Sequence, residues 1–599
     1  MRPLARLNYF FWKYKRLFVP GLLFTVLSAA FAITVPMIVR QAVDSIPRFV
    51  SIYHLFGGTA VQDQLFSDFF VSLMLFGLIV IGLSLASGVC SFLMRETVVV
   101  ASRHIEYDLR NALYTHLQTL PQSFFYKTST GDVITRSTSD IEQVRRYIGP
   151  AIMYITRAVV IMVTAITVML VISPTLTFYA LLPMPLLAIS VFFVAHMVHS
   201  RSEALQTQYS TLTSRVQEAL SGIRVLKAYT REESEARAFE VESSVYRGRM
   251  LSLARVDAAW RPVFILVIGL SQIFVVWMGG RLVTEGVITI GNIAEYIIYI
   301  ALITWPVAAL GFVISMVQRA AASIDRIHAV TDTVPTIADN GQTDHAITEI
   351  TGHLAFENVS FQYESKGPWV LQDVSFEIPA GTTLAIIGRT GSGKTTLVEM
   401  ITRLIEPVEG VVRVDGRDVR TVPLAVLREA TGHVPQDVFL FSETIASNIA
   451  FGALGASREA VEQAAMEAEL LDNILDFPKG FETFVGERGV TLSGGQKQRT
   501  SIARALIRDP RILILDDALS SVDTNTENRI LQHLRQRYGH QTVVIVSHRI
   551  STVRDADLIL VLDEGRVVER GRHDDLIMGE GLYAKLHRRQ ILEAELEDL

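Results

Sequence analysis

Six separate stretches of about 20 mainly apolar residues lie in the first half of the chain, and they constrain the fold more than any other feature. A helix needs about 20 such residues to cross the hydrocarbon core of a bilayer, because each residue adds about 1.5 Å to its length. The stretches cover residues 19–39, 69–92, 148–171, 176–198, 262–280 and 293–316. We therefore predict a multi-pass membrane domain of six helices, with the fourth kinked at Pro183 and Pro185.

Composition divides the chain into two parts. Half of the 599 residues are hydrophobic, and the mean hydropathy is +0.33, but this apolar excess ends near residue 320. The net charge is -6, and the sequence has no basic stripe that would neutralise a phosphate backbone, which argues against nucleic acid as a partner.

Cys90 is the only cysteine, so a disulfide framework and a cysteine-based metal site are excluded.

The charges beside the apolar stretches predict the topology. Residues 1–16 carry five basic side chains interleaved with aromatic ones, a pattern typical of a helix at the cytoplasmic membrane interface. A signal peptide is disfavoured, because the first apolar stretch is too long and no small-residue cleavage site follows it. The long connections 93–147 and 199–261 are rich in arginine, which places them in the cytoplasm. We expect a protein of the cell membrane whose N-terminus and second domain are both cytoplasmic.

The two long connections have helical apolar spacing over residues 101–120 and 202–226. At their far ends, residues 120–125 and 221–229 offer short turns with exposed apolar side chains. Such patches usually mark contact surfaces, although these turns could also simply close helical hairpins.

The second domain, predicted over 353–599 after the membrane domain 1–330 and a polar linker 331–352, has the pattern of an α/β nucleotide-binding domain. A buried-strand pattern at 384–387 leads into a glycine-rich loop and then an apolar helix, which is the required context of a P-loop. Its predicted phosphate-binding residues are Gly388, Thr390, Gly391, Ser392, Gly393, Lys394, Thr395 and Thr396. Lys394 would reach the β and γ phosphates, and the Thr395 hydroxyl would bind Mg²⁺.

Two further motifs belong with this loop. Residues 512–516 form a second buried-strand pattern that ends in Asp516, a suitable acidic partner for Mg²⁺. Ser493 is placed to cap a helix whose N-terminus would attract an anion, and it begins the string Ser493, Gly494, Gly495 and Gln496. On the residues alone, this string could also be a tight turn.

Together these motifs resemble the ATP-binding-cassette (ABC) transporter family, and the six stretches ahead of them resemble its exporters. The resemblance implies that two cassettes sandwich two ATP molecules, each held by the P-loop of one chain and the Ser493-type signature of the other. The partner would therefore be a second half-transporter. The implied cofactors are ATP and Mg²⁺.

The resemblance also implies individual roles. Tyr363 would stack on adenine, Gln436 would join Asp516 and Thr395 at Mg²⁺, and His548 would contact the γ-phosphate. Residues 520–523 would signal across the dimer, and Glu487 in the segment 483–489, which is typical of exporters, would contact the cytoplasmic loops.

One position departs from the family pattern. Most members have a catalytic Glu directly after the Asp516 position, whereas this chain has Asp517. A general base must come within roughly 2.6–3.2 Å of its proton, directly or through one water, and a misplacement of about 1 Å can cost on the order of 10²-fold in rate. The sequence therefore predicts a weakly hydrolysing site on this chain. The pattern resembles heterodimeric exporters with one degenerate site, which implies a partner chain that keeps its Glu, while a slow homodimer stays open.

Several functions stay open on the sequence. Export of lipophilic compounds, either drugs or lipids, is favoured by the apolar spans, while peptide export and an ATP-gated channel or regulatory ABC protein are alternatives. Glu295 lies in the sixth span, and an ionisable residue there is a candidate for the substrate site or a structural residue near the outer interface.

Overall fold

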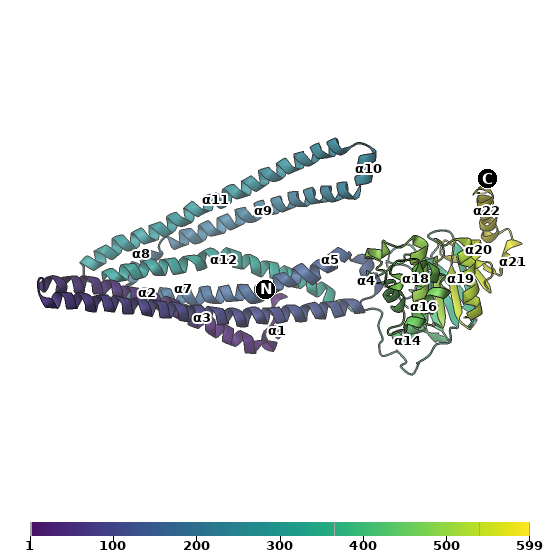
Figure 1. Cartoon of the computed structure of the whole chain (residues 1–599), viewed down its shortest axis with the longest axis horizontal. Coiled ribbons are helices and arrows are strands. Elements are labelled where there is room, and N and C mark those ends of the chain that lie inside the picture. Colours follow the sequence, from purple (N-terminus) through teal and green to yellow (C-terminus); the bar gives the residue numbers. More distant parts are fainter. Residues whose placement is uncertain (1–2, 365, 538–539, 598–599) are drawn as a thin grey trace. The chain divides into compact units, whose positions relative to one another are not determined.

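The computed structural model describes residues 3–364, 366–537 and 540–597 (Figure 1). The chain forms two compact units. One contains Met1–Leu117 and Gly131–Asp332, and the other contains Gln118–Thr130 and Thr333–Leu599. The second unit thus includes a short piece of the first long connection between spans, and each unit is described in turn below.

The first unit is helical. Six helical segments among the described residues are long and apolar enough to cross a membrane, which confirms the six predicted spans. The elements of this part of the chain, with the short α4 that belongs to the second unit, are η1 Pro3–Leu7, α1 Asn8–Lys13, α2 Lys15–Leu55, α3 Ala60–Thr119, α4 Gln122–Lys127, α5 Thr130–Thr135, η2 Arg136–Asp140, α6 Ile141–Arg146, η3 Tyr147–Ala151, α7 Ile152–Ile172, α8 Pro174–Leu181, α9 Met184–Ser221, α10 Ile223–Ala228, α11 Glu232–Thr284 and α12 Ile290–Thr331.

Helix α12 is the centre of this unit and packs against α2, α7, α9 and α11. Its side chains Tyr296 and Tyr299 are fully buried. The hydroxyl of Tyr296 donates to the carbonyl oxygen of Met169 at 2.5 Å. The fourth span is interrupted between α8 and α9, where Pro183 cannot continue the hydrogen-bond ladder, so the predicted kink is confirmed.

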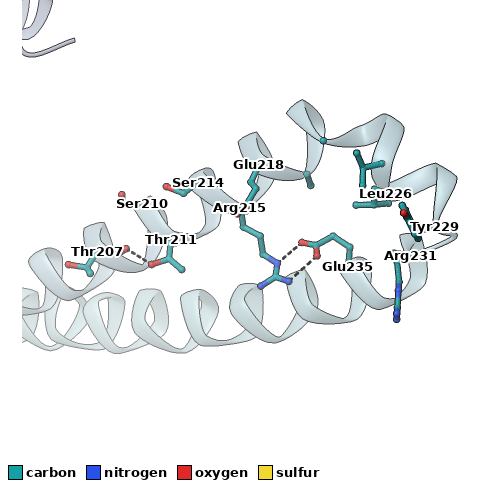
Figure 2. Close-up of a pocket in the computed structure, with 13 residues that line it drawn as sticks. Thr207, Ser210, Thr211, Ser214, Arg215, Glu218, Leu226, Tyr229, Arg231 and Glu235 are labelled. Atoms are coloured by element: carbon teal, nitrogen blue, oxygen red, sulfur yellow. Dashed lines mark hydrogen bonds and ion pairs between the residues drawn. The ribbon is translucent and has the colours of Figure 1, made fainter. Parts of the chain in front are cut away.

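Helices α9 and α11 lie side by side and are joined at their ends by α10 (Figure 1). Near α10 they enclose a cavity of about 1080 Å³, which is bridged by Arg215 and Glu235 with N–O distances of 2.6 and 3.0 Å (Figure 2). The neighbouring Val225 and Tyr229 are 63% and 75% exposed. The exposed apolar side chains predicted for this turn are therefore present.

The second unit has two sheets. A four-stranded antiparallel sheet has the order β2-β1-β4-β5, and a six-stranded sheet has the order β10-β9-β3-β8-β7-β6, in which only β10 pairs in antiparallel fashion. The strands are β1 Leu354–Phe361, β2 Leu371–Ile378, β3 Thr383–Gly388, β4 Glu409–Val414, β5 Arg417–Asp418, β6 Thr431–Val434, β7 Ile512–Asp516, β8 Thr542–Val546, β9 Leu558–Asp563 and β10 Arg566–Gly571.

Helices cover both faces of the six-stranded sheet. In β7, Ile512 and Ile514 join the core shared with the antiparallel sheet, while Leu513 and Leu515 join the core of the helical region around α15, α16, α18 and α19. A strand buried on both faces must be continuously apolar, as this one is. The helices are α13 Lys394–Ile401, η4 Val419–Thr421, α14 Leu424–Glu429, α15 Ile445–Ala450, α16 Arg458–Glu467, α17 Leu471–Leu475, η5 Gly480–Glu482, η6 Glu487–Gly489, α18 Gly494–Leu506, α19 Thr524–Arg537, α20 Ile550–Val553, α21 His573–Ile577 and α22 Leu582–Glu597.

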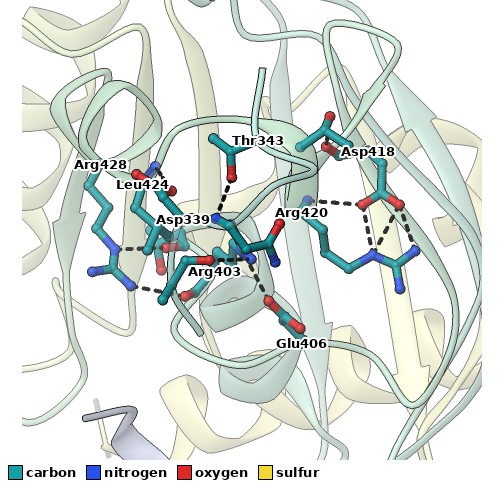
Figure 3. A network of polar contacts seen from close by, with 12 residues as sticks. Asp339, Thr343, Arg403, Glu406, Asp418, Arg420, Leu424 and Arg428 are labelled. Carbon is teal, nitrogen blue, oxygen red and sulfur yellow. Dashed lines mark hydrogen bonds and ion pairs between the residues drawn. The ribbon is translucent and has the colours of Figure 1, made fainter. Parts of the chain in front are cut away.

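The polar segment that leads into this unit is tied to its surface rather than free (Figure 3). The Asp339 carboxylate accepts the backbone N–H of Leu424 at 3.0 Å, and the backbone N–H of Asp344 donates to the carbonyl of Thr421 at 2.8 Å. Arg403, which is 2% exposed, lies beside this segment and pairs with Glu406 at 2.8 Å.

Candidate nucleotide site

The parallel strands β3, β8 and β7 bring three motifs to one edge of the sheet. Ile386 and Asp516 are both in register with Val546 on β8. The loop after β3, the carboxylates at the end of β7 and His548 after β8 therefore meet where parallel strands commonly bind ligands. They line a cavity of about 280 Å³.

Eleven of the predicted site residues line this cavity. They are Tyr363, Thr390, Gly391, Gly393, Lys394, Thr395, Thr396, Gln436, Asp516, Asp517 and His548. Gly388 and Ser392 are not among the lining residues. A Cβ at Gly388 would lie 2.1 Å from the carbonyl oxygen of Leu562, so only glycine fits there.

Backbone conformation sets the direction of the loop. Gly393 has φ +96°, and a Cβ there would lie 2.7 Å from the side chain of Leu371. Helix α13 begins directly after this turn, and its first residue is Lys394. Lys394 is 7% exposed, and its ammonium group donates to the carbonyl oxygens of Gly388 and Arg389 at 2.9 and 2.8 Å.

In the cavity, burial and the neighbouring charges shift the pKa values of Lys394 and Asp516 in opposite directions. Burial lowers the pKa of Lys394, while Asp516 and Asp517 partly counteract this effect. Burial also raises the pKa of Asp516, whereas a hydrogen bond from Thr395 lowers it and Asp517 raises it further. Two carboxylates outnumber the single ammonium group, and this excess of negative charge favours the binding of an additional cation.

The oxygen groups of the cavity fit Mg²⁺. Asp516 is 1% exposed, and its Oδ2 atom has no hydrogen-bond partner among the described residues. Thr395 and Gln436 line the same cavity with a hydroxyl and an amide oxygen. Mg²⁺ prefers such oxygen ligands and usually combines them with phosphate oxygens.

The backbone of Asp517 is held firmly. It has φ +49°, a left-handed conformation. Its N–H donates to Val546 at 2.9 Å, and its carbonyl accepts the hydroxyl of Ser520 at 2.9 Å. The main chain is thus fixed from both sides, and only the short side chain of Asp517 can reach into the cavity.

Tyr363 and His548 both line the cavity together with the P-loop residues. The Tyr363 ring is 45% exposed, and its hydroxyl is 2.9 Å from that of Thr396. Burial lowers the pKa of His548, Lys394 adds to this effect and Asp517 opposes it. The imidazole of His548 is therefore neutral near pH 7 and can donate one N–H.

The predicted signature does not line the cavity of its own chain. Ser493 caps α18 by accepting the N–H of Gln496 at 3.3 Å, and the Gln496 side chain accepts the N–H of Ser493 at 2.9 Å. A Cβ at Gly495 would lie 2.9 Å from the carbonyl oxygen of Ser521, whereas Gly494 is less confined. The capping prediction holds, but the string is free to serve another site.

Two residues that the sequence reasoning missed connect these motifs. Gln498 donates to the hydroxyl of Ser520 at 3.0 Å and accepts the N–H of Ser521 at 2.9 Å. Arg549 donates to the carbonyl of Ser520 at 2.9 Å and pairs with the buried Glu527 at 3.1 Å. Both belong to strings already recognised, next to Ser493 and His548, but single-sequence patterns do not reveal their partners.

A second missed contact involves α4, which belongs to the same unit. The Tyr126 ring meets the Tyr363 ring edge-on, with centroids 6.0 Å apart and an interplanar angle of 88°. Gln122 donates to the hydroxyl of Tyr126 at 2.6 Å and to the carboxylate of Glu399 at 3.4 Å. Burial raises the pKa of Glu399. Gln122 of the predicted contact segment 120–125 thus reaches Glu399, while the contact with the tyrosine of the nucleotide cavity is made by Tyr126, one residue beyond that segment.

Glu295, in the membrane unit, has a different environment. It is fully buried, and its carboxylate accepts hydrogen bonds from Tyr299 at 3.1 Å and Asn292 at 3.2 Å. Arg40 on α2 lies 3.6 Å away. Of the two roles that the sequence left open, this arrangement favours the structural one.

Family models match most of this architecture. Residues 18–307 match the ABC transporter transmembrane region, and residues 371–520 match the ABC transporter model. Among solved structures, a bacterial Atm1-family ABC exporter with ATP bound superposes with a TM-score of 0.78 at 28% identity, over 96% of this chain and 98% of that chain.

Several bacterial proteins are similar over most of their length. A probable multidrug resistance ABC transporter ATP-binding/permease protein, YheI of Bacillus subtilis, is 37% identical over 89% of this chain and 92% of its own. The multidrug resistance-like ATP-binding protein MdlA of Escherichia coli is 33% identical over 100% and 98%. An ATP-dependent lipid A-core flippase of Photobacterium profundum is 35% identical over 89% and 90%.

Proposed function

Because the chain belongs to the ABC exporter family and is an ATPase coupled to transport, we propose that it exports lipophilic compounds as one half of a heterodimer. In this proposal the chain binds ATP and Mg²⁺ at its own P-loop but hydrolyses ATP slowly there. Its signature completes the faster site on the partner chain. The membrane domain covers residues 1–330 and the cytoplasmic cassette 353–599, with 331–352 as the linker.

The observation that carries the proposal is Asp517. The shorter side chain could be compensated only if the main chain moved towards the reacting phosphate. Its N–H donates to the carbonyl of Val546, which the pairing of β7 with β8 holds in register, and its carbonyl accepts the hydroxyl of Ser520 in the loop that follows β7. A base that is held about one methylene too far away loses much of its rate, on the order of 10²-fold for about 1 Å.

The other residues of the cavity retain what ATP binding requires. Lys394 and the backbone N–H groups of the loop would hold the phosphates, and Tyr363 would stack on adenine. Asp516, Thr395 and Gln436 would hold Mg²⁺, which would supply charge neutralisation between the phosphates. His548 would donate its N–H to the γ-phosphate. In this proposal the cavity binds ATP and Mg²⁺ with its full set of ligands, while Asp517 limits the rate of hydrolysis.

The proposed substrate class is lipophilic, comprising drugs or lipids. Similar proteins are described as multidrug resistance transporters and as a lipid A-core flippase. The apolar residues of the spans are consistent with such a class. The exported compounds would leave the cytoplasm or the inner leaflet of the membrane.

The decisive experiment compares ATPase activity with and without a partner that carries the catalytic Glu. The chain purified alone should show little turnover, and the co-expressed pair should reach the ordinary range of ~1 to 10³ per second. Replacing the partner's Glu with Gln should abolish nearly all activity, while Asp517→Ala should leave much of it. A homodimer with full turnover that Asp517→Ala destroys would refute the heterodimer.

Two further variants of this chain separate its sites. Ser493→Ala should severely reduce activity of the pair, because Ser493 would serve the partner's working site. Asp517→Glu should add a second hydrolysing site and raise turnover. The two residues belong to one domain, so opposite effects cannot result from a common folding defect.

A further inference from the structure

The loop that carries His548 is held by hydrogen bonds on both sides of that residue. Before it, the N–H of Ser547 donates to the carbonyl of Ile386 on β3 at 3.2 Å. After it, the N–H of Arg549 donates to the hydroxyl of Ser547 at 3.0 Å, and the Arg549 guanidinium donates to the carbonyl of Val522 at 3.2 Å. None of these bonds involves the carbonyl of His548 itself.

Gln590, on the C-terminal helix α22, contacts that carbonyl. Its amide nitrogen donates to the carbonyl oxygen of His548 at 2.5 Å, and its amide oxygen accepts the N–H of Ile550 at 2.9 Å. The residue between them, Arg549, has an extended backbone with φ -96° and ψ 129°. A glutamine amide presents a donor and an acceptor in one plane. The two bonds together therefore fix the backbone that follows the imidazole of His548.

The start of α20 depends on the same amide. The first N–H groups of a helix have no partner inside the helix, and Arg549, at the N-cap position of α20, makes no side-chain cap hydrogen bond. Ile550 is 4% exposed, so its N–H needs an acceptor from the protein. Gln590 supplies this acceptor from a different helix, and it thereby sets the direction in which the chain leaves His548.

Helix α22 is anchored by other residues than Gln590. Tyr583 in its first turn is fully buried and belongs to the same apolar core as Ile550. The Tyr583 hydroxyl lies 2.7 Å from Nδ1 of His573. Gln590 follows Tyr583 by seven residues, or two helical turns, which places both on one face of the helix. Replacing Gln590 should therefore change the support of His548 without releasing α22.

We propose that Gln590 is a positioning residue for His548, and that its two hydrogen bonds hold the imidazole where it can donate to the γ-phosphate. Gln590 lies 42 residues after His548 and outside the motifs recognised in the sequence. Through this contact the C-terminal helix would set how strongly the site prefers a nucleoside triphosphate over a diphosphate. This inference rests on the proposed function, which assigns the γ-phosphate contact to His548.

The test compares the affinities of AMP-PNP, a non-hydrolysable ATP analogue, and of ADP at this chain's own site. Each probe displaces a fluorescent nucleotide from the full assembly in the presence of Mg²⁺, with the P-loop lysine of the partner chain replaced. His548→Ala should lower the ratio of the two affinities about tenfold, because a hydrogen bond to the charged γ-phosphate is lost. Gln590→Ala should lower it about fivefold, because an imidazole that is not held in place must be ordered on binding.

Three further variants separate positioning from a purely structural role. Gln590→Ala/His548→Ala should give the ratio of His548→Ala alone, since a residue that acts through the imidazole adds nothing once the imidazole is absent. Gln590→Glu keeps an acceptor for Ile550 but cannot donate to the His548 carbonyl when ionised, so it should lower the ratio as Gln590→Ala does and unfold near the wild-type temperature. Arg588→Ala, at an exposed position on α22, is the matched control and should keep the wild-type ratio.

Several results would overturn the proposal. An unchanged ratio in Gln590→Ala would refute it, and losses that multiply in the double variant would show that Gln590 acts by another route. A normal ratio in Gln590→Glu would reduce Gln590 to a cap of α20, and this variant decides alone if Gln590→Ala does not fold.

ATPase activity of the wild-type assembly separates this inference from the proposed function, because the ratio of affinities does not depend on the rate of hydrolysis. A homodimer with full turnover whose ratio falls in Gln590→Ala would refute only the proposed heterodimer. Slow turnover with an unchanged ratio in Gln590→Ala would refute only this inference. A ratio that is unchanged in His548→Ala would refute the γ-phosphate contact, and this inference with it.

Discussion

Asp516 and Glu295 are both buried carboxylates, but their surroundings differ in the property that distinguishes a binding site from a structural contact. Glu295 is surrounded by donors from Asn292, Tyr299 and Arg40. Asp516 keeps one buried oxygen without a partner among the described residues and borders a cavity. A buried polar atom without a partner costs about 1–3 kcal/mol. An unpartnered buried oxygen beside a cavity, as in Asp516, indicates a binding site for a ligand. A carboxylate that already has hydrogen-bond donors, as in Glu295, contributes to the packing of the helices.

The comparison is tested most strongly at Lys394, the cation next to Asp516. Lys394→Ala should weaken ATP binding at this chain's own site by about 100-fold, because charge-assisted hydrogen bonds of about 1.5–3 kcal/mol each are lost and each 1.4 kcal/mol is tenfold. The loss leaves Asp516 and Asp517 facing the phosphates without compensation. Titration with a fluorescent ATP analogue, with the partner's site blocked, measures the effect.

Arg389→Ala is the control for this change. Arg389 belongs to the same loop, but its side chain does not line the cavity, so its replacement should change the affinity only slightly. Membrane insertion should be normal in both variants. Unchanged nucleotide occupancy in Lys394→Ala would show that the P-loop interpretation is wrong.

Glu295 should give the opposite result, with a loss of stability and normal nucleotide binding. Glu295→Ala leaves the Asn292 amide without this acceptor and Arg40 without its carboxylate partner, while Tyr299 keeps the carbonyl of Ile33 as an acceptor; the change should cost about 3 kcal/mol. The thermal unfolding temperature should fall accordingly. Glu285→Ala removes an exposed carboxylate paired with Arg281 and should have almost no effect. If Glu295→Gln changed the transport of a cationic dye more than that of a neutral dye, Glu295 would instead line the transport path.

His433 on β6 extends the comparison to a buried base. Its Nε2 atom is buried without a partner in the described structure, and burial lowers the pKa of His433 to about 4. The unfolded chain binds the proton near pH 6.5, so stability is complete above that pH and declines as the pH falls towards 4. The loss at pH 5 should be about 2 kcal/mol. His433→Gln should remove this part of the pH dependence of unfolding, whereas His345→Gln, at an exposed position, should not. An identical pH profile for wild type and His433→Gln would contradict the interpretation.

The sequence predicted most of the fold because its signals are local. The six spans depend on stretches of about 20 apolar residues, and the P-loop depends on a contiguous string between a strand and a helix. Both patterns can be recognised without knowledge of contacts between distant residues. The break at Pro183 and the cap at Ser493 are equally local, because a missing N–H and a side-chain acceptor act on residues within one turn.

The remaining features depend on contacts between distant residues. Nothing in the string around Glu295 indicates that Arg40, more than 250 positions earlier, lies 3.6 Å away. The same is true of Gln498, whose partners Ser520 and Ser521 come from another loop. The sequence could therefore name the carboxylates of both environments, but only the fold distinguishes the one that borders a cavity from the one that is enclosed.

Tyr126 provides the smallest and most selective test, because its ring meets the ring of Tyr363, which lines the nucleotide cavity. An edge-to-face pair contributes about 0.5–1.5 kcal/mol, so Tyr126→Ala should weaken ATP binding roughly threefold by loosening the ring that stacks on adenine. Tyr126→Phe retains the ring and should bind ATP normally. Tripolyphosphate lacks the base, so its affinity should be the same in all three proteins, and Tyr229→Ala, at a tyrosine that is 75% exposed on another connection, serves as the control. If the affinities for ATP and tripolyphosphate fell together in Tyr126→Ala, the effect would act on the P-loop through Gln122 and Glu399, and the contact would stabilise α13 rather than position the adenine ring.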